Sequence, residues 1–194
     1  MSTKVWSNNF NTSNIDSAVE VLNKGGIILY PTETIWALGC KSIIKKSVKR
    51  VYEIKNRPYN MPFINLIDQV DKISNYIEDL DFKDLNLIKN YDFPPTIIYP
   101  NCKSKYSFLA NELNEISFRV TPLNELKKII NKLNSPIISS SANISGNEFP
   151  KSLDNISQSI LNSVDLILNF EVKSSGKPSE VIKINKGKIE YLRK

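Results

Sequence analysis

The segment most informative about the fold is Ile27-Ile28-Leu29-Tyr30-Pro31-Thr32-Glu33-Thr34. Its first half is short and continuously apolar, which is typical of a buried strand. Before it, apolar side chains recur at helical spacing from Ile15 to Leu22, and the glycines at 25 and 26 end that helix. After it comes a polar turn. A helix, a buried strand and a polar turn in succession indicate an α/β protein.

The rest of the chain continues this alternation. Ser47 and Asp68 each stand where a capping residue would open a helix. Two apolar runs around the turn 185–188 predict a C-terminal hairpin, and the loop 101–115 is the least ordered candidate. We therefore expect a mixed α/β sheet. The expected strands are 63–66, 96–99, 116–120, 136–138, 165–169, 181–184 and 189–192, and the expected helices are 47–55, 68–77, 85–89, 122–133 and 152–161.

Composition places the chain among proteins of one ordinary domain. Its 194 residues are 41% apolar, which supports one core, so we expect a single domain over residues 1–194. No run approaches the roughly 18 apolar residues of a membrane span. The N-terminus lacks an apolar signal core, which favours a cytoplasmic protein. Two cysteines are too few for a disulfide framework or a structural zinc site.

Histidine is absent from the chain. Its absence excludes Ser-His-Asp and Cys-His catalysis, histidine-ligated metals and histidine general bases. Any chemistry must therefore use lysine, arginine, hydroxyls, carboxylates, backbone amides or a metal carried by the substrate. The net charge of +6 favours anionic ligands, including nucleotides and RNA, although a lysine-rich composition alone gives the same charge.

Arginine is rare, and its positions are informative. Only four of the 26 basic residues are arginine. Arginine resists replacement by lysine where a planar, bidentate donor must bind phosphate or carboxylate. We interpret three of the four arginines as functional, because each lies where an element ends or where a charge is unfavourable: Arg57, Arg119 and Arg193. Arg50, in the middle of a helix beside Lys49, is interpreted as a surface residue.

A dense run of hydroxyl and amide side chains follows the strand at 136–138, with the sequence Ser139-Ser140-Ser141-Ala142-Asn143-Ile144-Ser145-Gly146. Such a loop offers O–H and N–H donors to an oxyanion. A polar turn that caps a helix has a similar composition, so both interpretations stay open. The run is not a P-loop, because the chain contains no G-x-x-x-x-G-K-[ST] pattern.

Two shorter segments likewise have both a functional and a purely structural interpretation. Thr34 ends a polar turn that either places it against a small polar ligand or serves only as a turn. Lys55 and Arg57 precede Pro58 at a helix end. They either reach one polyphosphate together or complement the helix dipole.

Taken together, these segments resemble the YrdC-like threonylcarbamoyl-AMP synthase family over nearly the whole chain. The resemblance implies a twisted, mixed, open α/β sheet with flanking helices and a positively charged concave face. It also implies synthesis of threonylcarbamoyl-AMP and pyrophosphate from L-threonine, bicarbonate and ATP. The segments that carry it are 30–34, 38–40, 55–58, 95–96, 119–120, 141–146, 178–179 and 192–193.

The resemblance also implies roles for individual residues. It assigns ATP contacts to Lys55, Arg57, Ser141, Asn143 and Arg193, and L-threonine contacts to Thr34, Arg119, Ser139 and Ser179. Catalysis would rest on Lys55 and Arg57, which neutralise charge at the α-phosphate, since such transfer needs positioning and electrostatics more than a nucleophile. Mg²⁺ is expected to arrive with ATP, with no metal held by the protein itself.

The same resemblance places the product in the modification of tRNA position 37 (t6A), with a threonylcarbamoyl-transferase complex downstream, direct RNA contact as an option and no membrane partner. Ala37 and Glu180 depart from the family pattern, which usually has glycine and often threonine at those positions. The alternative function is a non-catalytic RNA-binding YrdC-like protein, which the basic charge permits. The carbamoyl-transfer part of a hydrogenase-maturation protein is disfavoured, because that protein needs cysteine clusters.

Overall fold

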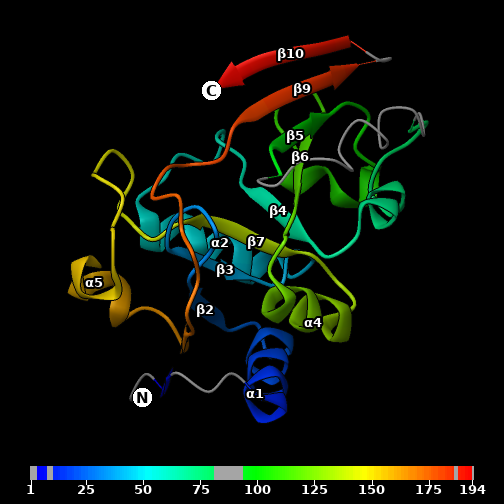
Figure 1. Cartoon of the computed structure of the whole chain (residues 1–194). Helices are drawn as coiled ribbons and strands as arrows, with labels where there is room; N and C mark the ends of the chain where they lie inside the picture. Colours follow the sequence, from blue (N-terminus) through cyan, green and yellow to red (C-terminus); the bar gives the residue numbers. More distant parts are fainter. Residues whose placement is uncertain (1–3, 8–10, 81–93, 186–187, 194) are drawn as a thin grey trace.

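The computed structural model describes residues 4–7, 11–80, 94–185 and 188–193 (Figure 1). Within them, ten strands form one twisted sheet in the order β1-β8-β2-β3-β7-β4-β6-β5-β9-β10. Parallel and antiparallel pairs both occur, which confirms the mixed open α/β sheet. The strands are β1 (Lys4–Ser7), β2 (Ile27–Tyr30), β3 (Ala37–Cys40), β4 (Ile64–Ile67), β5 (Thr96–Tyr99), β6 (Ile116–Val120), β7 (Ile137–Ser141), β8 (Leu166–Asn169), β9 (Val181–Asn185) and β10 (Lys188–Arg193).

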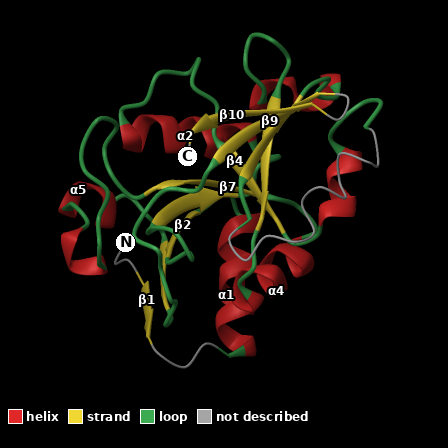
Figure 2. Ribbon diagram, turned by 45° about the horizontal axis from the view of Figure 1, so that its top comes forward, coloured by secondary structure: helices red, strands yellow, loops and turns green. Residues whose placement is uncertain are grey.

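Helices cover both faces of this sheet (Figure 2). α1 (Thr12–Asn23) and α4 (Asn124–Leu133) pack together on one face, and α2 (Lys45–Lys55) and α5 (Gln158–Leu161) lie on the other. Neighbouring buried residues of β2 divide between the two sides, as the pleat of a strand requires: Ile28 packs with α1 and α4, and Leu29 with α2. Short 3₁₀ helices are η1 (Val70–Asn75), η2 (Ser104–Leu109) and η3 (Leu153–Asn155).

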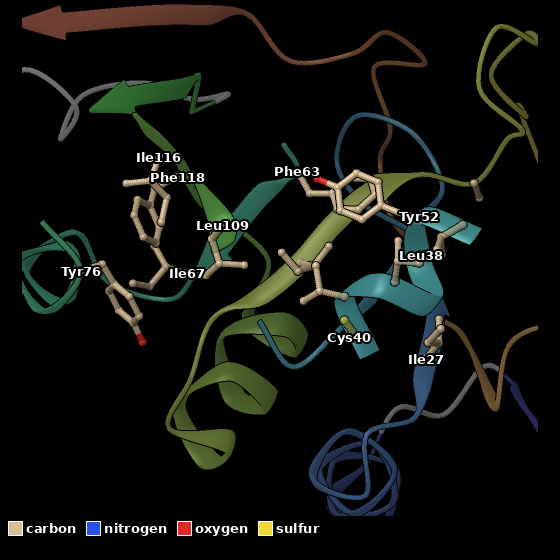
Figure 3. Close-up of a cluster of buried hydrophobic side chains, with 14 of the residues drawn as sticks. Ile27, Leu38, Cys40, Tyr52, Phe63, Ile67, Tyr76, Leu109, Ile116 and Phe118 are labelled. Atoms are coloured by element: carbon tan, nitrogen blue, oxygen red, sulfur yellow. The ribbon is translucent and has the colours of Figure 1, made fainter. Parts of the chain in front are cut away.

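The larger core cluster lies on the α2 face and contains several aromatic rings (Figure 3). The ring of Tyr52 lies 4.2 Å from that of Phe63, measured between centroids. Cys40 is part of this cluster as a free, buried thiol whose pKa is raised by burial. This cluster anchors α2, the helix that ends next to the candidate site.

The centre of the sheet depends on a close approach between β3 and β7. A Cβ atom on Gly39 would lie 1.8 Å from the carbonyl oxygen of Ile138. Only glycine fits there, because no real side chain tolerates such a contact. The neighbouring pair Ala37–Ser141 continues the same ladder, so the alanine at position 37 is accommodated within regular strand pairing.

Two predicted helix caps are wrong. Ser47 lies inside α2, and its hydroxyl donates to the carbonyl of Gly25 at 2.8 Å, which ties the helix to the turn between α1 and β2. Asp68 does not cap η1. Its Oδ2 instead accepts from Lys72 at 2.6 Å and from Asn131 at 3.3 Å. Each side chain has a partner distant in sequence, Gly25 for Ser47 and Asn131 for Asp68, which local spacing does not reveal.

Other differences concern the lengths of elements. The helix expected over 152–161 is divided into η3 and α5, and the loop 101–115 contains η2. β7 extends through Ser141, so the serines expected in a loop belong to a strand. β1 and β3 were not predicted by periodicity. The helix expected over 85–89 lies outside the described residues, as does the tip of the C-terminal hairpin at 186–187.

Candidate active site

A cavity of about 140 Å³ opens where the β2–β3 turn meets β6, β7 and the C-terminal strands. It brings together seven of the nine residues that the sequence predicted for the site, although they come from segments far apart in the chain. These are Thr34, Arg57, Arg119, Ser139, Ser141, Ser179 and Arg193. Ala37, one of the two residues that depart from the family pattern, also lines the cavity. The other, Glu180, is exposed, and its backbone carbonyl accepts a hydrogen bond from the amide of Thr96 at 2.8 Å.

Arg119, which belongs to β6, lines the cavity. Its two terminal nitrogens donate to the hydroxyl of Thr34 at 3.2 Å, and Nη2 also donates to the carboxylate of Glu33. The hydroxyls of Thr32 and Thr34 share a hydrogen bond of 2.8 Å. The guanidinium is thus held in one orientation, as the bidentate binding of a carboxylate requires.

Strand β7 supplies a wall of hydroxyls. Ser139, Ser140 and Ser141 all line the cavity and are partly exposed. Tyr30 lies buried beside Ser139; burial raises the pKa of the tyrosine, while the Ser139 hydroxyl and Arg119 oppose that rise. The wall therefore offers neutral hydrogen-bonding groups next to a cation.

Arg57 is positioned by the turn that ends α2. Asn56 has left-handed backbone angles, φ 48° and ψ 47°, which turn the chain away from the helix axis. Arg57 Nε then donates to the carbonyl of Met61 at 2.9 Å, and its guanidinium lies 5.0 Å from the centre of the Phe63 ring. Burial lowers the pKa of Arg57, but an arginine stays charged at neutral pH.

The C-terminal strands close the cavity on its remaining side. The hydroxyls of Ser179 and Thr96 share a hydrogen bond of 2.9 Å. Arg193, on β10, donates from Nε and Nη2 to the carbonyl of Ser179 at 3.0 and 2.7 Å. Arg57 and Arg193 also line a second cavity of about 210 Å³. The two guanidinium groups therefore border both spaces.

Lys55 and Asn143 are not among the residues that line the main cavity. Lys55 is only 1% exposed. Its ammonium donates to Asn143 O at 2.6 Å, to Asn143 Oδ1 at 3.3 Å and to the carbonyl of Ser141. Burial, followed by the charge of Arg57, lowers the pKa of Lys55 to about 7. Both residues shape the loop after β7, and their contacts with ATP remain predictions.

Sequence reasoning missed several residues of the site. Thr32 and Glu33 belong to the quoted turn but have no role predicted from sequence, because their partners at the site, among them Arg119, become neighbours only in the folded chain. Phe149, which is 43% exposed, and Ile35 also line the cavity. Isolated apolar residues in loops carry no local signal of this kind.

In the described part of the chain, no group of three or more histidine, cysteine, aspartate or glutamate side chains is placed to hold a metal ion. The same residues contain no helix of the length and apolarity that crossing a membrane requires.

The fold and the cavity define an α/β protein with a pocket lined by hydroxyl groups and three arginines. The chain belongs to the Sua5_yciO_yrdC family, described as "Telomere recombination", whose model matches residues 20–194. Among its relatives, the threonylcarbamoyl-AMP synthase of Xanthomonas axonopodis pv. citri is 26% identical over 92% of this chain and 97% of its own. That of Aliivibrio fischeri is 29% identical over 87% of this chain and 92% of its own.

Solved structures show the same fold. P. abyssi Sua5 complexed with L-threonine superimposes with a TM-score of 0.85 at 23% identity and covers 99% of this chain. This chain spans 56% of that Sua5 chain. E. coli YciO superimposes with a TM-score of 0.79 at 22% identity, covering 99% of this chain and 95% of its own.

Proposed function

We propose that this protein is a threonylcarbamoyl-AMP synthase, which makes threonylcarbamoyl-AMP and pyrophosphate from L-threonine, bicarbonate and ATP. The observation that carries the proposal is the convergence of Arg119 and Thr34 on one small cavity bordered by Arg57 and Arg193. In this proposal Arg119 binds the carboxylate of an amino acid, and Arg57 and Arg193 bind the phosphates of a nucleotide. The shared cavity then brings together two substrates that must react with one another. Membership of the family and the names of its relatives support the same function.

The threonine site comprises Thr34, Arg119, Ser139 and Ser179 in this proposal. Arg119 binds the carboxylate through its fork, and the three hydroxyls take the amine and the side-chain hydroxyl. The Sua5 structure with L-threonine, which shares the fold, supports an amino-acid ligand. A cavity of about 140 Å³ accommodates a ligand of that size.

The ATP site comprises Lys55, Arg57, Ser141, Asn143 and Arg193. Arg57 and Arg193 stabilise charge on the phosphates, and Ser141 offers a hydroxyl at the cavity wall. Lys55 and Asn143 act here by holding the end of β7, where Ser141 lies, and the loop that follows it. Mg²⁺ enters as part of the MgATP substrate, held by phosphate oxygens.

The reaction then needs no protein nucleophile. The threonine nitrogen bonds to the carbon of bicarbonate with loss of water, which gives a carbamate. A carbamate oxygen next bonds to the α-phosphorus, and the bond from that phosphorus to the pyrophosphate oxygen breaks. Oriented arginines stabilise the charge that moves to the leaving pyrophosphate. Transfer of the product to tRNA position 37 by a separate transferase, in the cytoplasm, completes the proposal.

The proposal is tested by incubating the protein with ATP, labelled bicarbonate and one amino acid at a time. Threonine should give labelled adenylate and pyrophosphate. Serine should react about 10- to 200-fold less efficiently, because it lacks one methyl group. 2-Aminobutyrate should be worse still, since it leaves the hydroxyl-binding groups unpaired. Equal turnover with 2-aminobutyrate would contradict the hydroxyl-reading site. No turnover, together with salt-sensitive RNA binding, would favour the non-catalytic alternative.

A further inference from the structure

Glu33 lies directly behind the arginine of the proposed threonine site. Arg119 and Thr34 line the cavity, whereas Glu33 is not among its lining residues. Glu33 and Arg119 are only 3% and 6% exposed, and Arg119 Nη2 donates to Glu33 Oε1. The guanidinium that faces the cavity is therefore already compensated by a buried carboxylate.

The backbone holds Glu33 in place independently of Arg119. The amide of Ser175 donates to the Glu33 carbonyl at 2.9 Å, and the amide of Gly176 donates to the Thr34 carbonyl at 2.9 Å. In Figure 1 this partner segment is part of the orange stretch that leads into β9. Thr32 closes the turn from inside, because its hydroxyl accepts from the amide of Thr34 at 3.2 Å. The turn thus fixes the backbone that carries Glu33, and the carboxylate itself accepts from Arg119.

Stability does not explain this pair. Removing two charges from water costs about as much free energy as their attraction returns, so buried ion pairs are weak stabilisers. Here Glu33 Oε2 and Arg119 Nε are also buried without a hydrogen-bond partner in the described structure, which adds to the cost. Unsatisfied polar atoms in a native protein call for a functional explanation.

On the basis of the proposed function, we propose that Glu33 is a positioning residue that makes the pocket select a net-neutral amino acid over an anion with the same carboxylate. An uncompensated buried guanidinium attracts any monoanion, and bicarbonate, the second substrate, is one. Beside the Glu33–Arg119 pair, whose charges cancel, a monoanion meets no net positive charge, and its only counter-charges are Arg57 and Arg193 at the border of the cavity. An α-amino acid carries an ammonium next to its carboxylate, so the ligand and the Glu33–Arg119 pair together have a net charge of zero.

The test compares two ligands by calorimetry in the absence of ATP. One is L-threonine, and the other is 2,3-dihydroxybutyrate, which has a hydroxyl in place of the amine and is a monoanion. We expect the wild-type protein to prefer threonine by about 100-fold, and Glu33→Gln to reduce that preference by about tenfold or more because the anion gains affinity. Bicarbonate should likewise compete with threonine in Glu33→Gln and not in the wild type.

The control is Asp68→Asn, which removes the buried carboxylate of another ion pair, with Lys72, and Asp68 lines neither the main cavity nor the second cavity that Arg57 and Arg193 border. It should leave the preference unchanged. A Glu33→Gln variant that loses affinity for both ligands equally would indicate a merely structural role and overturn the proposal. So would a wild-type protein that binds both ligands within about twofold, a result that needs no variant. Failure of wild-type protein to bind threonine would instead overturn the proposed function.

Discussion

At the scale of the residue, the ammonium group of Lys55 is buried against three oxygen atoms of one loop. An ammonium has three N–H donors, so the charged form satisfies all three acceptors. Burial acts in the opposite direction and, with the charge of Arg57, lowers the pKa of Lys55 to about 7. Above that pH a neutral Lys55 would add no charge to a phosphate site, which leaves that role to Arg57 and Arg193.

Lys55 should make stability depend on pH. The folded chain loses this proton near pH 7, whereas the unfolded chain keeps it to about 10.5. The unfolded state therefore binds more protons between those values, and the free energy of unfolding should rise with pH by up to about 1.4 kcal/mol per unit. Urea denaturation of wild type and Lys55→Met from pH 6 to 9 measures this pH dependence. The free energy of unfolding of the wild type, minus that of Lys55→Met, should increase with pH.

The matched control for this experiment is Lys49→Met, which removes a positive charge from the exposed face of the same helix. It should not change the slope of stability against pH. A constant difference between wild type and Lys55→Met across the range would show that Lys55 keeps its proton and that its three acceptors outweigh burial.

At the scale of the element, the end of α2 determines where Arg57 lies. Asn56 adopts φ 48° there, and the amide of Arg57 donates to the carbonyl of Tyr52 at 3.0 Å. This left-handed end reverses the chain, so that the guanidinium reaches the 61–62 backbone and the cavity. Asparagine tolerates this conformation better than most residues.

Asn56→Ala should lower the free energy of unfolding by about 1 kcal/mol, because alanine is strained in the left-handed region. It should also raise the KM for ATP, since Arg57 loses its fixed position. Asn134→Ala is the matched control: Asn134 ends α4 with φ 49° and does not line the cavity. Urea denaturation should show a similar loss of unfolding free energy for both variants. Pyrophosphate release should show a raised KM for ATP only for Asn56→Ala. An unchanged KM in both would contradict the role of this turn.

At the scale of the whole molecule, the junction of β3 with β7 joins two parts of the sheet. One part is β1-β8-β2-β3 and the other is β7-β4-β6-β5-β9-β10. Thr34 comes from the first part and Arg119 from the second, so the site exists only when the parts are joined. The cavity is therefore a property of the assembled sheet.

Gly39→Ala should break this junction. The added Cβ would meet the carbonyl of Ile138, which belongs to the backbone of the paired strand and has no room to move. We expect a loss of at least about 3 kcal/mol in the free energy of unfolding, together with loss of threonine binding. Gly146→Ala serves as the control, because its φ of +89° adds strain but no atom lies within 4 Å. It should cost about 1–2 kcal/mol. Equal stability of the two variants would contradict the close-packing argument.

Local sequence patterns are sufficient to predict the alternation of helices and strands, the mixed α/β class and most members of the site. Apolar periodicity and turn residues act between near neighbours, so the buried strand at 27–30 and the strand at 116–120 are readable from the chain. The rarity of arginine singled out Arg57, Arg119 and Arg193, and the tertiary structure places all three at the cavity.

Which of these residues face the cavity and which support it depends on the assembled fold. The sequence predicts Lys55 at the phosphates, but its side chain is buried against the end of β7 and the loop that follows it. Glu33 has no role predicted from sequence but pairs with Arg119, 86 residues away. Ser47 and Asp68 likewise bond to distant partners instead of capping helices. The physical reason is that burial, charge compensation and strand order depend on contacts between remote segments, which local sequence patterns do not encode.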